Sequence, residues 1–428
     1  EIGVRLVGSE MCIRDRDKGT VRLILNNASI SNTTTAPIKV LDAKKVILTL
    51  ADNTTNTITD SSRLSTEEDY SAAIYSKEDL IINGNGTLNV NAGYRNGIKS
   101  TDDCIIVSGT LNITSTEDGI IGKDLCGVVA GDININAGSD GIKSTYDTDT
   151  TKGNVIIEGG NITIKASNDG IQAENILVIN DGAINIKTNN GAADTTQTHI
   201  DNMDMGRGGF GFNNNKTTTT TDDTSESRKG IKAGNMLIIN DGDITIDSDD
   251  DSVHCNSVIY IYGGTINAAT GDDGVHADDL LTVNGGTINI TQCYEGLEAD
   301  DIVINDGDIS VVSSDDGINS SDGSITINGG NLLINASGDG LDANGSIIIN
   351  DGYIVVLGPT SDGDTAIDYD DSCTINGGTV MAFGSSGMLE IPKGASNGAC
   401  IVTAFTSVSG GSKYTLSDSN GNEILSYT

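Results

Sequence analysis

The sequence predicts an all-β fold: a parallel β-helix, or solenoid, of about 13 coils of about 22 residues, with three short strands per coil. The first observation is a repeated Asp-Gly-Ile/Leu/Val motif, whose copies mostly follow one another at intervals of 21 to 23 residues. The second is that each repeat contains three stretches in which apolar and polar residues alternate, which is the period of a strand. A propeller is excluded because each of its blades needs about 40 residues.

The central glycine of the motif, called here the glycine position, marks each coil. It is occupied by Gly97, Gly119, Gly141, Gly170, Gly230, Ser252, Gly274, Gly296, Gly317, Gly340 and Ala366. The next residue is always apolar, and the residue two places further on is mostly small, as at Ile171 and Ala173. We expect both to point inward, because a bulky column beside a small one fills a narrow β core. Triplets such as Asn284-Gly285-Gly286 form the corners, since Asn and Gly tolerate a positive φ.

The chain divides into four parts. Residues 1–16 resemble translated sequencing-adapter read-through, and we set them apart as an artefact or a disordered segment. Residues 17–384 are assigned to the β-helix, interrupted at 190–229 by a low-complexity insertion that is either a disordered loop or a functional loop over a site. Residues 385–428 are expected to cap the rod, and the chain stops as if truncated within a strand. A signal peptide or anchor is therefore expected to be missing.

The charge of the chain excludes two classes of partner. The 428 residues include 61 acidic and 24 basic ones, which gives a net charge of −37. Nucleic acids and anionic membranes are bound through basic surfaces, which this chain lacks. No run of 18 apolar residues occurs, so we expect no membrane span.

Acidic residues recur at the same place in successive coils. The residue before the glycine position, called here the acid column, is Asp118, Asp140, Asp169, Lys229, Asp251, Asp273, Glu295, Asp316 and Asp339. Stacked carboxylates about 5 Å apart repel by roughly 3 kcal/mol at an effective dielectric of 20, so they call for protons or cations. Calcium prefers such oxygen ligands. The candidate calcium ligands are Asp250, Asp251, Asp272, Asp273, Glu295, Asp315 and Asp316. The alternative is that these Asp residues only shape turns.

A second column contains the other candidate binding residues. The second residue after the glycine position, called here the outward row, places Lys232, His254, His276 and Glu298 on four successive coils. Together with Tyr294 they form a candidate ligand-binding site beside the acid column. The alternative is a structural role for each.

The cysteines are expected to be buried hydrophobic residues. Cys104 and Cys126 are 22 residues apart, which permits but does not require a disulfide between adjacent coils. No Cys/His spacing typical of a zinc site occurs along the chain.

Several phrases resemble a known family. Tyr294-Glu295-Gly296-Leu297-Glu298, the Asp-Asp-Gly-Val-His of 272–276 and the Asn-Gly-Gly-Thr-Ile-Asn corner of 284–289 are similar to bacterial, largely clostridial, cell-surface carbohydrate-binding proteins. The resemblance covers roughly residues 17–400. It implies a right-handed β-helix similar to that of pectate lyases, an extracellular or cell-surface location, and polysaccharide binding with calcium in acidic pockets. The 190–229 insertion and the abrupt C-terminus depart from the family pattern.

Three functions remain open. The first is calcium-dependent binding of plant cell-wall or acidic glycans, such as polygalacturonate or cellulose, by a monomer that does not cleave them. The chain has no Trp, so sugar stacking would fall to tyrosines, namely Tyr260, Tyr262, Tyr294, Tyr353 and Tyr369. The second is a calcium-dependent polysaccharide lyase with Lys232 or Lys143 as its base. The third is a surface adhesin.

Overall fold

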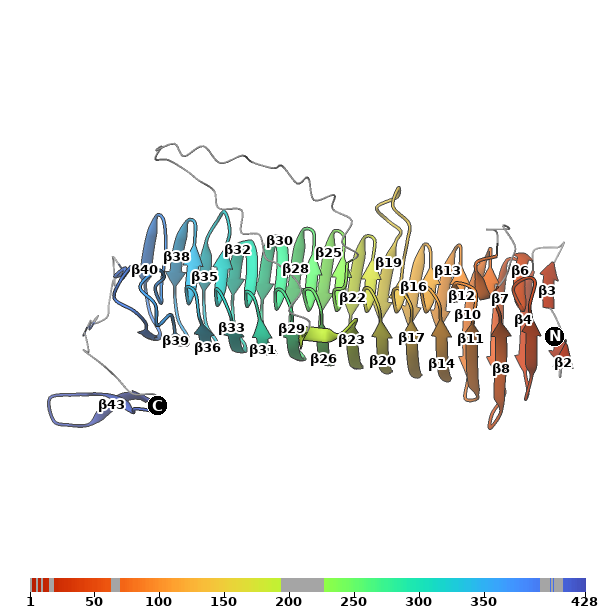
Figure 1. Ribbon diagram of the computed structural model, residues 1–428, viewed down its shortest axis with the longest axis horizontal. Helices are drawn as coiled ribbons and strands as arrows, with labels where there is room; N and C mark the ends of the chain where they lie inside the picture. The colour runs from red at the N-terminus through yellow and green to blue at the C-terminus, as the bar shows by residue number, and fades with distance from the viewer. Residues whose placement is uncertain are drawn as a thin grey trace.

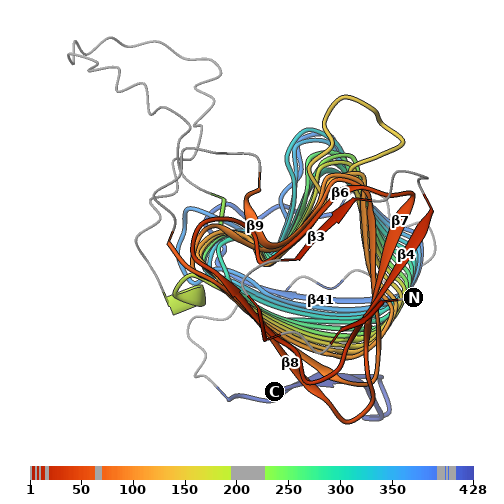
Figure 2. The ribbon, with the colours of Figure 1, turned by 90° about the vertical axis from the view of Figure 1, so that its right-hand side faces the viewer.

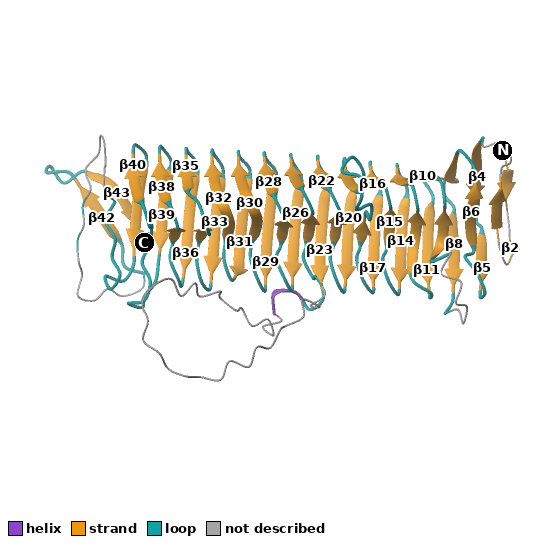
Figure 3. Cartoon of the chain, turned by 90° about the horizontal axis from the view of Figure 1, so that it is seen from above, coloured by secondary structure: helices purple, strands orange, loops and turns teal. Residues whose placement is uncertain are grey.

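The protein is a long rod of stacked turns (Figure 1). The computed structural model describes residues 2–4, 7–8, 11–14, 19–62, 70–193, 227–392, 401, 403 and 411–428. These residues are almost entirely strands and turns (Figure 3), with one 3-10 helix, η1 (Gly191–Ala193). The described residues contain no helix that is long and apolar enough to span a membrane. The predicted all-β solenoid is therefore confirmed.

Each turn contributes three strands, which stack on their counterparts in the next turn as three parallel ladders. The first ladder consists of β3 (Met11–Arg14), β6 (Ile38–Asp42), β9 (Ala72–Ser76), β12 (Asn96–Ser100), β15 (Ile120–Gly122), β18 (Ile142–Lys143), β21 (Ile171–Ala173), β24 (Ile231–Ala233), β27 (Val253–Cys255), the start of β30 (Val275–Val283), the start of β32 (Leu297–Ile304), β34 (Ile318–Ser320) and β37 (Leu341–Ala343).

The second ladder consists of β1 (Ile2–Val4), β4 (Thr20–Leu25), β7 (Lys45–Leu50), β10 (Asp79–Gly84), β13 (Asp103–Ile106), β16 (Leu125–Val128), β19 (Asn154–Ile157), β22 (Ile176–Ile179), β25 (Met236–Ile239), β28 (Val258–Ile261), the ends of β30 and β32, β35 (Ile325–Ile327), β38 (Ser346–Ile349) and β40 (Ser372–Ile375). It joins the first ladder in one 26-stranded sheet, because β30 and β32 run through the corner between the two.

The third ladder is a separate 15-stranded sheet. It consists of β2 (Val7–Gly8), β5 (Ser29–Asn32), β8 (Thr55–Asp60), β11 (Thr87–Ala92), β14 (Thr110–Ser115), β17 (Asp132–Ala137), β20 (Asn161–Ala166), β23 (Ala183–Thr188), β26 (Asp243–Ser248), β29 (Thr265–Thr270), β31 (Thr287–Cys293), β33 (Asp308–Ser313), β36 (Asn331–Ala336), β39 (Tyr353–Leu357) and β41 (Thr379–Phe383). Viewed end-on, the turns lie almost on top of one another (Figure 2). Equivalent residues of successive turns therefore form columns along the rod.

The core is the predicted pair of inward columns. Ile171 is fully buried and pairs in register with Ile142 before it and Ile231 after it. The small column beside it is buried as well, and it includes Ala173 and Cys255. Cys104 and Cys126 are buried register partners with free thiols. Burial raises the pKa of Cys126 to about 12, so its thiol is unreactive at neutral pH.

Two kinds of glycine shape the turn. The corner glycines have a positive φ, as at Gly286 with 91°. At the glycine position the requirement is space: a Cβ on Gly141 would lie 2.5 Å from the carbonyl oxygen of Gly170 and 2.5 Å from Cγ2 of Ile164. This close packing explains why the motif contains glycine in most turns.

The segment boundaries can now be compared with the structure. Parallel pairing reaches into residues 1–16, where β1, β2 and β3 pair with β4, β5 and β6, and the rod has about 14 turns instead of about 13. The insertion is described as far as η1 and again from residue 227, and the rest of it lies outside the described residues. At the other end, β42 (Tyr414–Ser417) and β43 (Glu423–Tyr427) form an antiparallel hairpin, and its Tyr414 ring lies 4.8 Å from that of Phe383 in β41.

Candidate functional site

The acid column has a structural role along much of the rod. The backbone N–H of most members donates to Oδ1 of the member one turn earlier, whereas the N–H of Asp251 donates to Oδ1 of its neighbour Asp250. The distances are 3.1 Å from Asp273 to Asp251, 3.1 Å from Glu295 to Asp273, and 2.6 Å from Asp339 to Asp316. This is the turn-shaping role that the sequence left open. It uses only one oxygen of each carboxylate, so Oδ2 remains available for other contacts.

The outward row lies beside the acid column, as predicted. Lys232, His254, His276 and Glu298 are register partners on β24, β27, β30 and β32. Each member lies three residues after the acid-column residue of its own turn, so the two columns run side by side. The Oδ2 atoms of the acid column face the row: His254 Nδ1 lies 2.9 Å from Asp251 Oδ2, and His276 Nδ1 lies 3.4 Å from Asp273 Oδ2.

Lys229 partly neutralises the acid column where the insertion ends. Its Nζ lies 2.8 Å from Asp250 Oδ1 and 2.5 Å from Asp251 Oδ2. Burial opposes the charged form of Asp251, but the Lys229 ammonium outweighs it and holds the pKa of this carboxyl well below its ordinary value. Burial likewise lowers the pKa of Lys229, but Asp251 and Asp250 raise it above its ordinary value. Two of the predicted calcium ligands thus already have a cationic partner.

His276 is the centre of the cluster. Its Nδ1 lies 3.2 Å from Glu298 Oε2 and 3.7 Å from Asp251 Oδ2, in addition to its contact with Asp273. Burial lowers the pKa of His276, but the hydrogen bond to Asp273 and the surrounding negative charge raise it to about 10. Burial and repulsion from Asp273 raise the pKa of Glu298 to about 9. At neutral pH His276 and Glu298 therefore both keep a proton, whereas an isolated glutamate would be ionised.

The predicted calcium ligands fall into separate groups. Asp250, Asp251 and Asp272 bring one oxygen each within 4.8 Å of one another, and burial with nearby charge raises the pKa of Asp272 to about 8. Glu295 accepts a 2.8 Å hydrogen bond from Asn319, and its pKa is raised to about 8, mainly by burial. Asp315 belongs to no such converging group among the described residues.

Asp316 belongs to a group that the sequence did not single out. Asp316, Asp339 and Asp342 also converge within 4.8 Å, and in the described part of the chain no basic side chain forms an ion pair with them. Burial and neighbouring carboxylates raise the pKa of Asp316 to about 9 and that of Asp342 to about 7. A third convergence, of Asp79, Asp102 and Asp103, lies nearer the N-terminus. Asp342 lies in the outward row, three residues after Asp339 of the acid column. This spacing is a signal in the sequence that could have identified the pair.

The remaining candidates are placed less favourably for chemistry. Lys143 forms a 2.5 Å ion pair with Asp140, which raises the pKa of the lysine despite its burial. Lys232 Nζ donates to Ser227 Oγ at 3.1 Å. Tyr294 is half-buried, and its backbone N–H donates to the carbonyl of Asp272 at 2.7 Å.

The tyrosines differ in what they can offer a sugar. Tyr262 and Tyr353 are exposed, whereas Tyr369 is buried in the core, so the expectation that Tyr369 stacks on a sugar is wrong. Its ring occupies the inward small column near the end of the rod, and its hydroxyl donates to the carbonyl of Ile391 at 2.9 Å.

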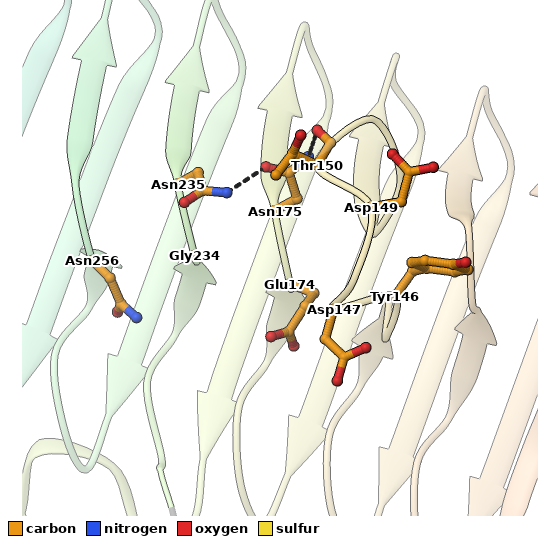
Figure 4. A pocket seen from close by; sticks show the side chains of 9 residues that line it. All are labelled: Tyr146, Asp147, Asp149, Thr150, Glu174, Asn175, Gly234, Asn235 and Asn256. Carbon is orange, nitrogen blue, oxygen red and sulfur yellow. Dashed lines mark hydrogen bonds between the residues drawn. The ribbon is translucent and has the colours of Figure 1, made fainter.

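Figure 4 shows the residues that line a shallow polar groove. It follows the corner between the first and second ladders and includes the short insertion after β18. Its lining consists of Tyr146, Asp147, Asp149, Thr150, Glu174, Asn175, Gly234, Asn235 and Asn256. Asn235 donates to Asn175 Oδ1 at 2.7 Å, and Asn256 contacts His254 Nε2 at 2.9 Å. The groove therefore reaches His254 through Asn256.

The chain is similar to known carbohydrate-binding domain-containing proteins. A family model described as "Carbohydrate-binding domain-containing protein" matches residues 3–274 and 272–397. A protein of the same description from Acetivibrio thermocellus is 39% identical over 95 residues, which is 21% of this chain and 33% of that protein. The chain thus spans about a third of the length of this relative. A solved polysaccharide lyase-like protein from C. thermocellum, studied as a gadolinium derivative, is 33% identical over 42% of this chain and 75% of its own, with a TM-score of 0.41.

Proposed function

The chain belongs to the family of carbohydrate-binding domain-containing proteins, and on that premise we propose that it binds an extended polysaccharide through calcium without cleaving it. The polysaccharide we favour is an acidic or plant cell-wall glycan such as polygalacturonate. We place the protein outside the cell or on its surface, as a monomer. The long side of the rod, with its repeated columns of polar side chains, suits an extended polymer better than a small ligand.

The observation that carries the calcium part is the convergence of Asp316, Asp339 and Asp342. Their oxygens lie within 4.8 Å of one another, and the pKa of each carboxyl is raised. Such a group holds either protons or a cation at neutral pH. An oxygen-only ligand set favours a hard ion such as calcium. Because the chain has a net charge of −37, an acidic glycan would be repelled unless a cation bridged the two sets of carboxylates.

Binding without cleavage is favoured by the state of Lys143. A lyase base must be neutral to take a proton from the sugar, and the ion pair with Asp140 keeps Lys143 charged. One observation supports the competing lyase function: burial lowers the pKa of Lys99, which lies in the outward row nearer the N-terminus.

Affinity electrophoresis in gels containing polygalacturonate or cellulose tests the binding proposal. We expect polygalacturonate to retard the chain in the presence of calcium, and a chelator to abolish the retardation. Asp342→Asn should weaken the calcium-dependent retardation, whereas Asp306→Asn, the same change at an exposed corner, should not. Equal retardation with and without chelator would contradict the calcium bridge.

Cleavage is tested on the same polymer by following the absorbance of unsaturated product in the presence of calcium. We expect none from the unaltered chain. Product that disappears in Lys99→Ala, Lys143→Ala or Lys232→Ala would replace the binding function with a lyase function.

A further inference from the structure

The two neighbouring histidines direct their equivalent ring nitrogens to the same sides. The rings of His254 and His276 meet edge to face, with centroids 4.9 Å apart. In both rings Nδ1 faces the acid column, while Nε2 faces the corner that contains Asn256 and Asp278. In metal sites, a ligating histidine binds the ion with one ring nitrogen while a hydrogen-bond partner holds the other nitrogen. The two imidazoles here have this arrangement, with carboxylates on the Nδ1 side and polar partners on the Nε2 side.

His254 contributes a buried nitrogen without a hydrogen-bond partner. The residue is 8% exposed, and its Nδ1 has no hydrogen-bond partner. Its Nε2 lies 2.9 Å from Asn256 Oδ1, and because an amide oxygen only accepts, Nε2 carries the proton. Its Nδ1 lies 2.9 Å from Asp251 Oδ2, on the side of the ring that faces the acid column.

The surrounding donors form two converging groups that share His276. Asp251, His254 and His276 each place a donor atom within 4.8 Å of the others, and so do Asp273, His276 and Glu298. In the group that contains both histidines, Asp251 Oδ2 lies 2.9 Å from His254 Nδ1 and 3.7 Å from His276 Nδ1. Ligands held at about 2.1 Å from a tetrahedral ion lie about 3.4 Å apart, so these separations need little adjustment.

We propose that His254 and His276 bind a divalent transition-metal ion of the zinc class together with Asp251, the carboxylate that converges with both imidazoles. Asp251 Oδ2 also contacts the Lys229 ammonium, and Asp273 and Glu298 flank the site through their contacts with His276. Imidazole nitrogens favour zinc, cobalt, nickel or copper, whereas calcium prefers oxygen alone. The site differs in this respect from the Asp316 group, and the inference goes beyond the proposed glycan binding and does not depend on it.

Titration with cobalt(II) chloride alone tests the site in the full chain after chelator treatment. A cobalt ion with imidazole ligands gives visible absorption bands, which report the coordination directly. We expect a saturable signal from one ion per chain, displaced by zinc but not by a large excess of calcium. Displacement by calcium as readily as by zinc, or no saturable signal, would overturn the proposal.

Variants assign the signal to residues. His254→Ala and His276→Ala should each abolish it, and Asn256→Ala, which removes the partner of Nε2, should weaken cobalt binding about 10- to 100-fold. The matched control is His199→Ala, which alters the third histidine of the chain, outside the described residues, and should leave the signal intact. Circular dichroism shows which variants fold, and His276, with a side chain that is 25% exposed, is the safer substitution. An unchanged signal in folded His276→Ala, or its loss in His199→Ala, would contradict the assignment.

Discussion

The Nδ1 atom of His276 lies 3.2 Å from Oε2 of Glu298, its register partner one turn further along the rod. This contact joins the basic and acidic parts of the outward row. Among the described ion pairs, His276 is the only cationic partner of Glu298. The stability of this part of the rod should therefore depend on the charge of one imidazole.

Replacing His276 by Gln in metal-free protein should lower the free energy of unfolding by about 3 kcal/mol, because Asp273 and Glu298 lose the cationic partner that they contact. Glu298→Gln in the same background should restore part of the loss. Denaturant unfolding of both single variants and the double variant measures the coupling. Strictly additive effects would show that the two residues do not stabilise each other.

Stability in chelator should fall as the pH rises from about 4 to about 9. The pKa values of Asp272 and Glu295 are raised to about 8 and that of Asp316 to about 9, so the folded chain binds more protons than the unfolded chain throughout this interval. The stability contributed by these protons is complete below the ordinary carboxyl pKa and is lost as the pH passes the raised values. Thermal melts at several pH values measure the slope, and calcium should flatten it. A melting temperature that rises toward pH 9 in chelator would contradict the assignment.

Asp316 should respond differently to two substitutions. Asp316→Asn keeps an oxygen for the N–H of Asp339 and removes repulsion, so in chelator it should be as stable as the unaltered chain or more stable. Asp316→Ala loses that hydrogen bond and should be less stable than the Asn variant by about 1 kcal/mol. Both should lose most of the stabilisation by calcium. A full calcium response in Asp316→Asn would exclude this group as a calcium site.

Two glycines separate close packing from general effects of substitution. Gly141→Ala should destabilise the chain by about 1–3 kcal/mol, because the new Cβ would meet the next turn at 2.5 Å. Gly127→Ala is the control: the nearest atom to its Cβ would be 3.7 Å away, and Ala should be neutral or slightly stabilising there. Thermal or denaturant unfolding compares the two. Equal losses would mean that contact between turns does not determine the glycine position.

The fold could be predicted because its physics is local and repetitive. A strand period of two, three strands per repeat and a corner of Asn and Gly leave few architectures other than a parallel solenoid. The same repeat predicted that Ile171 lies inward and that His254 and His276 are neighbours, and the register confirms both. The repeat places Tyr369 in the inward small column, three residues after Ala366. This position is incompatible with sugar stacking, because the ring is buried.

By itself the sequence determined which residues stack along the rod, because parallel in-register pairing turns a 22-residue repeat into columns. Only the tertiary structure decided which columns meet and which atoms they present. Lys229 neutralises Asp250 and Asp251. Oδ1 of Asp251 accepts a hydrogen bond from the backbone of the next turn, while its Oδ2 faces His254. These contacts depend on the backbone path at the corner and on side-chain rotamers, and neither is contained in the period of the repeat. The acidic composition therefore predicted that the stacked carboxylates need protons or cations. The structure identified two different kinds of group, one of carboxylates alone at Asp316 and one with imidazoles at His254 and His276.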